Sequence, residues 1–290
     1  MKLKPKTKKA IVFMVIGFLI IFIVIAFVKN NSQVYKSIDT KGKLLVHFID
    51  VGQGDSILLM ADNKTLLIDT GPNSKKNEFL DYLKSTGITK LDYIIATHPH
   101  EDHIGNMSYV IQKYDIGKFY APKITSTTDS YNSMVKALNK KSKKITVSKG
   151  GMSFKLGSDV LCEILAPNNS SYDNLNNYSV VLKVTFKDTS FLLTGDAEKE
   201  SEDEILSQKY ILKADVLKLG HHGSSTSTTP DFLQSVDPKI AIASCGINNS
   251  YGHPNDEIIN LLTENNIHLF RTDLDKTIIL ESDGKIIKRK

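Results

Sequence analysis

The chain has 290 residues, eight histidines, two cysteines and a formal net charge of +5. Residues 1–30 hold six lysines and no acidic residue, so subtracting these six charges from +5 leaves −1 for the rest. A nearly neutral remainder excludes binding to nucleic acid through a global basic surface. It is also long enough, at about 250 residues, to bury one full hydrophobic core.

The first 42 residues predict a membrane anchor. Residues 1–9 form a basic segment, and residues 10–28 are nineteen uncharged, almost wholly apolar residues. As a helix they rise about 28 Å, which just spans the hydrocarbon core. We therefore expect a transmembrane signal anchor at 10–28, residues 1–9 in the cytoplasm, a polar linker at 29–42 and the rest of the chain outside the cell membrane. A cleaved signal peptide is the alternative, although the run is long and lacks a small-x-small cleavage site.

After the linker, strand patterns alternate with helix patterns. Short apolar runs predict strands at 44–51, 56–60, 65–68, 92–96, 118–121, 160–166, 180–186, 190–194, 215–219, 240–244, 268–271 and 277–281. Helices are predicted at 77–85, 104–113, 131–140, 198–208 and 256–265, and Gly87 suits a helix cap. This order predicts the α/β (α+β) class, as one αββα sandwich of two mixed β-sheets flanked by helices over residues 43–290.

The stretch His98-Pro99-His100-Glu101-Asp102-His103 follows a predicted strand and predicts a metal site. Residues two apart in an extended turn point the same way, so His98 and His100 can bind one ion. Asp102 and His103 open a helical pattern and can face a second ion. Three imidazoles and a carboxylate in six residues are far more specific than scattered loop histidines.

Two downstream motifs supply further ligands. The apolar run 191–194 ends in Gly195-Asp196, whose carboxylate can bridge two cations, and the run 216–219 ends at His221 and His222. Taken alone, an Asp after Gly is more often a turn residue, and a His pair is often polar surface. Because all three motifs fall where a strand ends and a loop begins, we predict one site with one or two divalent ions, zinc or manganese.

The order H-x-H-x-D-H, then Gly-Asp, then a late His resembles the metallo-β-lactamase fold superfamily, with Asp69 similar to its early carboxylate beside the metals. The segments 48–56, 177–179, 221–224 and 251–254 further resemble the extracytoplasmic hydrolase-like domain of ComEC-type competence proteins and their stand-alone relatives, over about residues 43 to 288. The resemblance implies that Asp50, Asp69 and Asn177 support the metal site. It also implies a function for His253, as metal ligand or as proton donor to the leaving group; a satisfied loop histidine is the alternative.

One departure from the superfamily concerns the mid-chain histidine that many members carry. No histidine occurs between His103 and Asp196, and the nearest candidates there are Asn176, Asn177 and Ser179. Neutral oxygen donors bind zinc more weakly than imidazole does, so the His98/His100 ion is expected to be loosely held, absent or a harder ion such as manganese.

Further polar groups near these motifs are weaker candidates. Ser179, Ser224, Ser225 and His253 are expected to hold substrate oxygens, although Ser/Thr runs are most often only loops. A group of lysines is expected to form a solvated helix face, with an electrostatic binding surface for a polyanion as the alternative. These are Lys136, Lys140, Lys141, Lys143, Lys144 and Lys149. Cys162 and Cys245 are expected to be buried free thiols, with a disulfide as the alternative.

These observations favour a membrane-anchored, extracytoplasmic, metal-dependent hydrolase. Asp102 or Asp196 would orient a metal-bound hydroxide, and the resemblance points to a phosphodiesterase or nuclease acting on DNA or a cell-surface phosphodiester polymer. The alternatives are a catalytically weak DNA- or wall-polymer-binding module associated with competence, and a hydrolase of another ester class. One anchor helix cannot form a multi-helix channel, so a role in DNA uptake would need a protein partner that the sequence does not identify.

Overall fold

The computed structural model describes residues 14, 17–18, 21–22 and 38–290. Residues 38–290 form one compact unit. The basic segment 1–9, most of the predicted anchor 10–28 and most of the linker 29–42 lie outside the described residues. Within the described part of the chain, no helix is both long and apolar enough to cross a membrane.

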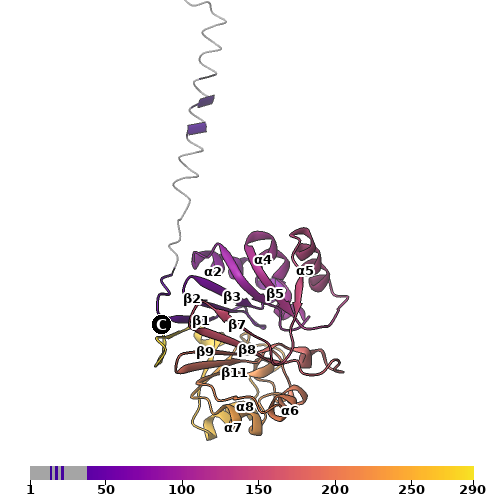
Figure 1. Ribbon diagram of the computed structural model, residues 1–290, viewed down its shortest axis with the longest axis vertical. Helices are drawn as coiled ribbons and strands as arrows, with labels where there is room; N and C mark the ends of the chain where they lie inside the picture. Colours follow the sequence, from indigo (N-terminus) through magenta and orange to yellow (C-terminus); the bar gives the residue numbers. More distant parts are fainter. Residues whose placement is uncertain (1–13, 15–16, 19–20, 23–37) are drawn as a thin grey trace, which may run out of the picture. The chain divides into compact units, whose positions relative to one another are not determined.

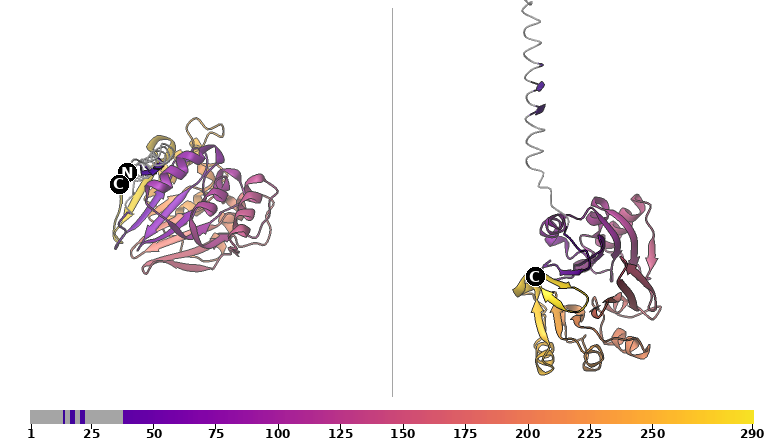
Figure 2. Two further views of the ribbon diagram at one scale, coloured as in Figure 1. Left: turned by 90° about the horizontal axis from the view of Figure 1, so that it is seen from above. Right: turned by 60° about the vertical axis from the view of Figure 1, so that its left-hand side comes forward.

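Two mixed sheets form the centre of this unit (Figure 1). The first has eight strands in the order β15-β14-β1-β2-β3-β4-β5-β6. Their bounds are β1 Leu44–Phe48, β2 Ile57–Ala61, β3 Lys64–Ile68, β4 Lys90–Ile95, β5 Asp115–Ala121, β6 Ile145–Val147, β14 Ile278–Ser282 and β15 Ile287–Arg289. Strands β3 to β6 run parallel, and the other neighbouring strands are antiparallel. The last two strands of the chain extend this sheet next to β1, because β14 pairs with β1 and β15 pairs with β14 (Figure 2).

The second sheet has seven strands in the order β13-β12-β11-β10-β9-β8-β7. Their bounds are β7 Ser153–Leu156, β8 Val160–Ala166, β9 Val181–Phe186, β10 Thr189–Leu193, β11 Val216–Lys218, β12 Ile240–Ala243 and β13 His268–Arg271. Strands β10 to β13 are parallel, and their carboxyl ends therefore meet at one edge of the sheet.

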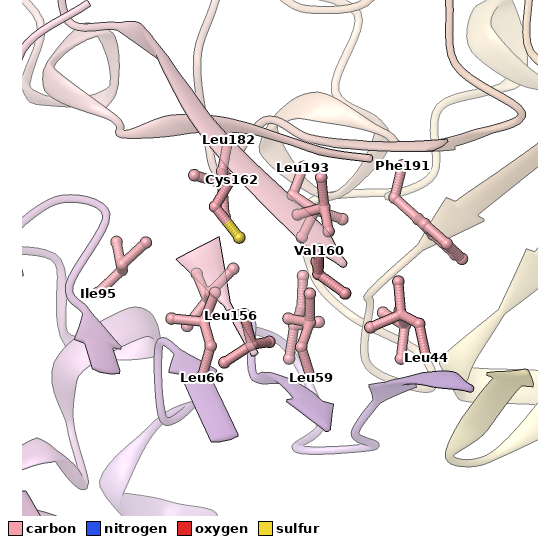
Figure 3. Packing of buried hydrophobic residues seen from close by; sticks show 14 of the residues in the cluster. Leu44, Leu59, Leu66, Ile95, Leu156, Val160, Cys162, Leu182, Phe191 and Leu193 are labelled. Atoms are coloured by element: carbon pink, nitrogen blue, oxygen red, sulfur yellow. The ribbon is translucent and has the colours of Figure 1, made fainter. Parts of the chain in front are cut away.

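Alternating apolar residues make the two sheets pack face to face. In β1, Leu44, Val46 and Phe48 enter the core between the sheets, whereas Leu45 faces the outer layer, as the two-residue period of a strand requires. Figure 3 shows this inner core, in which Leu59 and Leu66 of the first sheet face side chains of the second. The predicted αββα sandwich is confirmed for the sheets and their helices.

Helices cover both outer faces (Figure 1). The first sheet is covered by α2 Lys76–Ser85, α4 Met107–Lys113 and α5 Asp129–Lys140, and the second by α6 Lys199–Ser207, α7 Pro230–Val236 and α8 Asp256–Glu264. Their apolar stripes supply the two outer cores, as with Phe79 and Leu83 of α2. Cys162 and Cys245 are both buried and free, as expected.

The predicted helix 104–113 is wrong at its start. The chain instead forms α3 Glu101–Ile104, breaks, and resumes as α4. Asn106 explains the break, because its buried side chain donates hydrogen bonds to the carbonyls of Thr70 and Pro72 at 3.0 and 2.8 Å. The H-x-H-x-D-H motif is thereby tied to the loop after β3.

Candidate functional site

The three predicted motifs meet at one edge of the sandwich. The residues from His98 to His103 follow β4, Asp196 follows β10, and the 3-10 helix Gly220–Gly223 follows β11. Strands β10 and β11 are parallel neighbours, so their carboxyl ends deliver Asp196 and the histidine pair to the same place. Open sheets commonly place their chemistry at this kind of edge.

Asp196 lies at the centre of the cluster. Its Oδ2 is 3.1 Å from His103 Nε2, 3.4 Å from His222 Nε2 and 3.8 Å from His98 Nε2. Asp102 Oδ2 lies 3.3 Å from the same His222 nitrogen. One ligand atom from each of Asp102, His103, Asp196 and His222 lies within 4.8 Å of all the others, and we call these four residues the metal cluster.

The metal cluster has the chemistry of a divalent cation site. Asp196 Oδ1 and His103 Nε2 are buried and make no hydrogen bond within the described residues. Two carboxylates and two imidazoles are ligands that zinc and manganese both accept. If both imidazoles are protonated the metal-free group is neutral, and a divalent cation that displaces those two protons leaves the charge unchanged.

Mutual attraction keeps the imidazoles of the metal-free cluster protonated and its carboxylates ionised. Burial opposes protonation of His103, but Asp196 and Asp102 outweigh it and hold its pKa well above the usual range. Burial opposes protonation of His222 too, and Asp196 and Asp102 again raise its pKa well above normal. For Asp196, burial favours the neutral acid, yet His103 and His222 hold its pKa well below the usual range.

The remaining predicted ligands lie around the cluster. His98 Nε2 is 2.9 Å from His100 Nδ1, so these two imidazoles lie side by side, and neither belongs to the metal cluster. His221 is partly exposed, with Nδ1 3.1 Å from Glu198 and Nε2 3.9 Å from Asp196. Of the two adjacent histidines, His222 therefore enters the cluster, and His221 pairs with Glu198 at its rim.

A buried carboxylate orients His103. Asp69 Oδ2 lies 2.7 Å from His103 Nδ1, and the Asp69 carboxylate also accepts hydrogen bonds from the backbone N–H and the hydroxyl of Thr97 at 2.8 and 2.6 Å. An acceptor at Nδ1 fixes the proton on that nitrogen and leaves Nε2 facing the cluster. Asp69 thus occupies the supporting place that the resemblance implied.

The other predicted supporting residues have different places. Asp50 Oδ1 accepts the Gly52 N–H at 3.2 Å, and its Oδ2 is 3.9 Å from Lys276, so within the described residues Asp50 stabilises a loop rather than the cluster. Asn177 accepts the Glu198 N–H at 3.0 Å and donates to Glu200, which fixes the start of α6. Both differ from the predicted role beside the metals.

Three of the predicted substrate contacts also differ from expectation. Ser179 is fully buried; its hydroxyl accepts the Asp196 N–H at 3.0 Å and lies 3.3 Å from His98 Nδ1. It therefore positions Asp196 and His98 and has no face for substrate. Ser224 bonds to Thr226 at 3.0 Å, and neither Ser224 nor Ser225 lines the cavity over the cluster.

Two charged residues beside the metal cluster were not singled out by the sequence analysis. Asp55 Oδ1 lies 3.4 Å from His222 Nδ1, and its Oδ2 lies 2.8 Å from Lys218 Nζ. Burial raises the pKa of the Asp55 carboxyl, but Lys218 and His222 outweigh it and hold that pKa below the usual range. The signal was a lysine inside an apolar strand, since a buried lysine needs an acidic partner.

The cluster opens into a cavity of about 550 Å³. Its lining includes Asp102, Asp196, His253, Tyr251 and Lys75. His253 is brought to the site as predicted, and burial, aided by the charges of His221 and His222, lowers its pKa to about 4. Its ring is therefore neutral at pH 7 and stacks on exposed Tyr251, with ring centroids 5.6 Å apart.

Comparisons with known proteins agree with this geometry. The family model of the metallo-beta-lactamase superfamily matches residues 49–247. ComE operon protein 3 of Bacillus subtilis is 34% identical over 84% of this chain and 34% of its own length. Competence protein ComA of Neisseria gonorrhoeae is 32% identical over 78% of this chain and 30% of its length. The chain thus spans about a third of these relatives. The metallo-beta-lactamase fold protein YhfI of Bacillus subtilis superposes with a TM-score of 0.56 at 12% identity, over 82% of this chain and 100% of YhfI.

Proposed function

Because the chain belongs to the metallo-beta-lactamase superfamily, we propose that it is a metal-dependent hydrolase of phosphodiesters, with nucleic acid as the favoured substrate. The observation that carries this proposal is the metal cluster at the base of an open cavity. A divalent cation bound there lowers the pKa of bound water toward 7 and offsets the charge that grows on the attacked group.

The chain's own residues have distinct parts in such a reaction. Asp102 is the most exposed member of the cluster, with 32% of its side chain accessible, and it lines the cavity, where its carboxylate can accept a hydrogen bond from the attacking water and orient it. Asp196 is held between the imidazoles and fixes their spacing. Neutral His253 can hydrogen-bond the leaving oxygen, but its lowered pKa leaves it without the extra proton of an imidazolium at pH 7.

The cavity wall supports a substrate that is both anionic and aromatic. Lys75 lines the cavity, where its ammonium, 3.3 Å from Glu78, can attract a phosphate, and Tyr251 lines it with 68% of its surface exposed. Exposed aromatic rings beside basic groups are typical of sites for single-stranded nucleic acid, because bases stack on them. A glycerol phosphate polymer has no ring that could stack on Tyr251 in this way.

A metal-by-substrate matrix tests the proposal on the full chain. Zinc and manganese forms are assayed with single-stranded DNA, duplex DNA, bis-p-nitrophenyl phosphate, p-nitrophenyl phosphorylcholine, a chromogenic β-lactam and a thioester. We expect phosphodiester cleavage that a strong chelator abolishes, with manganese at least as effective as zinc. Cleavage of the lactam or thioester alone would refute the substrate class. If the dialysed protein retains no metal, the result would favour a binding module over an enzyme.

We also propose that residues 10–28 anchor the protein in the cell membrane and that the hydrolase unit faces outward. The support is the row of lysines before an uncharged run of nineteen residues. Protease added to intact cells should remove the unit after residue 30 and spare residues 1–9. A mature product that begins near residue 31 would contradict the anchor and indicate a cleaved signal.

A further inference from the structure

Lys218 occupies an unusual place for a lysine. It lies at the end of β11 between two parallel neighbours, opposite Leu193 of β10 and Ile242 of β12, and its side chain is 0% exposed. Its ammonium lies 2.8 Å from Asp55 Oδ2 and donates to the Leu219 carbonyl at 2.8 Å. The Asp55 side chain is 2% exposed, so the whole ion pair is removed from water.

Stability alone does not require such a pair. The cost of removing two charges from water offsets most of their attraction, and apolar residues of similar volume commonly stabilise a core as well. A buried pair of this kind is therefore better explained by what it does to its neighbours. The neighbour here is His222, a member of the metal cluster.

The contacts of His222 show how the ion pair acts on its imidazole ring. Its Nδ1 faces two acceptors, the Asp55 carboxylate at 3.4 Å and the Ser244 carbonyl at 2.9 Å. Two acceptors at one nitrogen require that Nδ1 carry a proton. When the imidazole is neutral, its lone pair is then on Nε2, which faces Asp102 and Asp196.

Asp55 also ties together the loops that carry the cluster. Its backbone N–H donates to the Asp102 carbonyl at 3.2 Å, and its carbonyl accepts the Gly71 N–H at 2.8 Å. A Cβ on Gly54 would lie 2.3 Å from the Asp102 carbonyl oxygen, so the two backbones touch at this point. A shift of Asp55 therefore moves Asp102 and His222 together.

The charge of Lys218 has a second consequence. Asp55, Asp69 and His103 form another group whose ligand atoms lie within 4.8 Å of one another, so a cation could bind there instead of in the metal cluster. The neighbouring carboxylate Asp69 is held by the two donors of Thr97 and by His103, whereas the cation beside Asp55 is a lysine that cannot act as a ligand while it is protonated. A fixed ammonium 2.8 Å from Asp55 repels any metal ion from this second group.

We propose that Asp55 and Lys218 are positioning residues that fix His222 for metal binding and keep the cation out of the neighbouring Asp55/Asp69/His103 group. This inference rests on the proposed metal-dependent function. Asp55 orients the imidazole of His222, and Lys218 holds Asp55 in place as an internal cation. Neither residue touches substrate.

Metal affinity in the absence of substrate tests the proposal. Asp55→Asn and Lys218→Met are compared in the full chain with Lys183→Met, which removes another strand lysine whose ammonium donates to the Ile211 carbonyl at 2.6 Å, away from the cluster. Competition with a chromogenic chelator should show zinc bound roughly 10- to 100-fold more weakly in both test variants and unchanged in the control. In Lys218→Met, part of the zinc should bind the Asp55/Asp69/His103 group instead of the metal cluster, because the two groups share His103.

A spectroscopic readout separates positioning from mere stability. In the zinc-loaded wild type, histidine side-chain NMR should show His222 with a water-protected proton on Nδ1. That proton should exchange faster in both test variants. If either single variant fails to fold, the double variant Asp55→Leu/Lys218→Met removes both charges and still lacks the orienting carboxylate, so its zinc affinity should also fall.

Zinc affinity within twofold of the wild type in the folded variants, with an unchanged Nδ1 proton, would overturn the inference. Failure of the proposed function looks different. A wild type that binds zinc tightly but cleaves no phosphodiester would refute that function, and the dependence of zinc affinity on Asp55 and Lys218 would remain.

Discussion

Breaking the Asp55–Lys218 pair should cost far more stability than removing it whole. At 2.8 Å and an effective dielectric constant of about 20, the attraction between the two charges is roughly 6 kcal/mol. Lys218→Met loses this attraction and leaves Asp55 buried without its cation, which should lower the free energy of unfolding by about 3–5 kcal/mol. For a unit of this size, the melting temperature should then fall by roughly 6–20 °C.

The double variant Asp55→Leu/Lys218→Met supplies the comparison. It loses the attraction and both desolvation costs together, so its unfolding free energy should lie within about 1 kcal/mol of the wild type or above it. Urea unfolding of the metal-free chain should be followed by far-UV circular dichroism, because the chain has no tryptophan. A loss below about 1 kcal/mol in Lys218→Met would show that water, another cation or protonation of Asp55 compensates the remaining carboxylate, which would refute the reasoning.

Three further perturbations test the site and the fold. Asp196→Ala should keep the circular dichroism of the wild type but lose its bound metal, and its phosphodiester turnover should fall at least about a thousandfold, since the cation's stabilisation of charge is worth several kcal/mol. Asp203→Asn, at an exposed carboxylate, is the control, and metal-dependent turnover in Asp196→Ala would contradict the assignment. Tyr251→Ala should raise KM for single-stranded DNA about 5- to 100-fold and leave an abasic strand unaffected; equal effects on both strands would exclude stacking. Burial lowers the pKa of His47 to about 4, so its ring stays neutral in the folded protein, whereas in the unfolded chain it takes up a proton below about pH 6.5. The free energy of unfolding should therefore fall as the pH falls toward 4, by about 1.4 kcal/mol per pH unit. His47→Gln should lessen that slope, and an unchanged slope would show that other groups cause it.

Apolar patterns in the sequence were enough for the central strands but found only one of the four edge strands, β13. The apolar runs in 44–48 and 160–166 predict β1 and β8 because those strands are buried. The edge strands β6, β7 and β15 were not predicted, since each is short and largely exposed, and an exposed edge needs no apolar pattern. Helix α7 was missed for a similar reason, because its seven residues are too few to show a period.

The metal ligands of the H-x-H-x-D-H motif could be read from the sequence because they are adjacent. The choice between His221 and His222 could not, since it depends on the backbone: both residues adopt left-handed conformations, with φ of 47° and 59°, and this turn sends the two rings in different directions. The Asp55–Lys218 pair could not be predicted, because the two residues lie far apart along the chain. Only the packing of the two sheets brings the loop after β1 against the end of β11.

No histidine occurs between His103 and Asp196, and the two sides of the site differ accordingly. Beside His98, the Ser179 hydroxyl lies 3.3 Å from Nδ1, while Nε2 faces His100 and Asp196. The metal cluster, in contrast, holds two carboxylates and two imidazoles, each with its own supporting contacts. Metal affinity should therefore depend chiefly on the cluster, and its carboxylates explain why a harder ion such as manganese should serve at least as well as zinc.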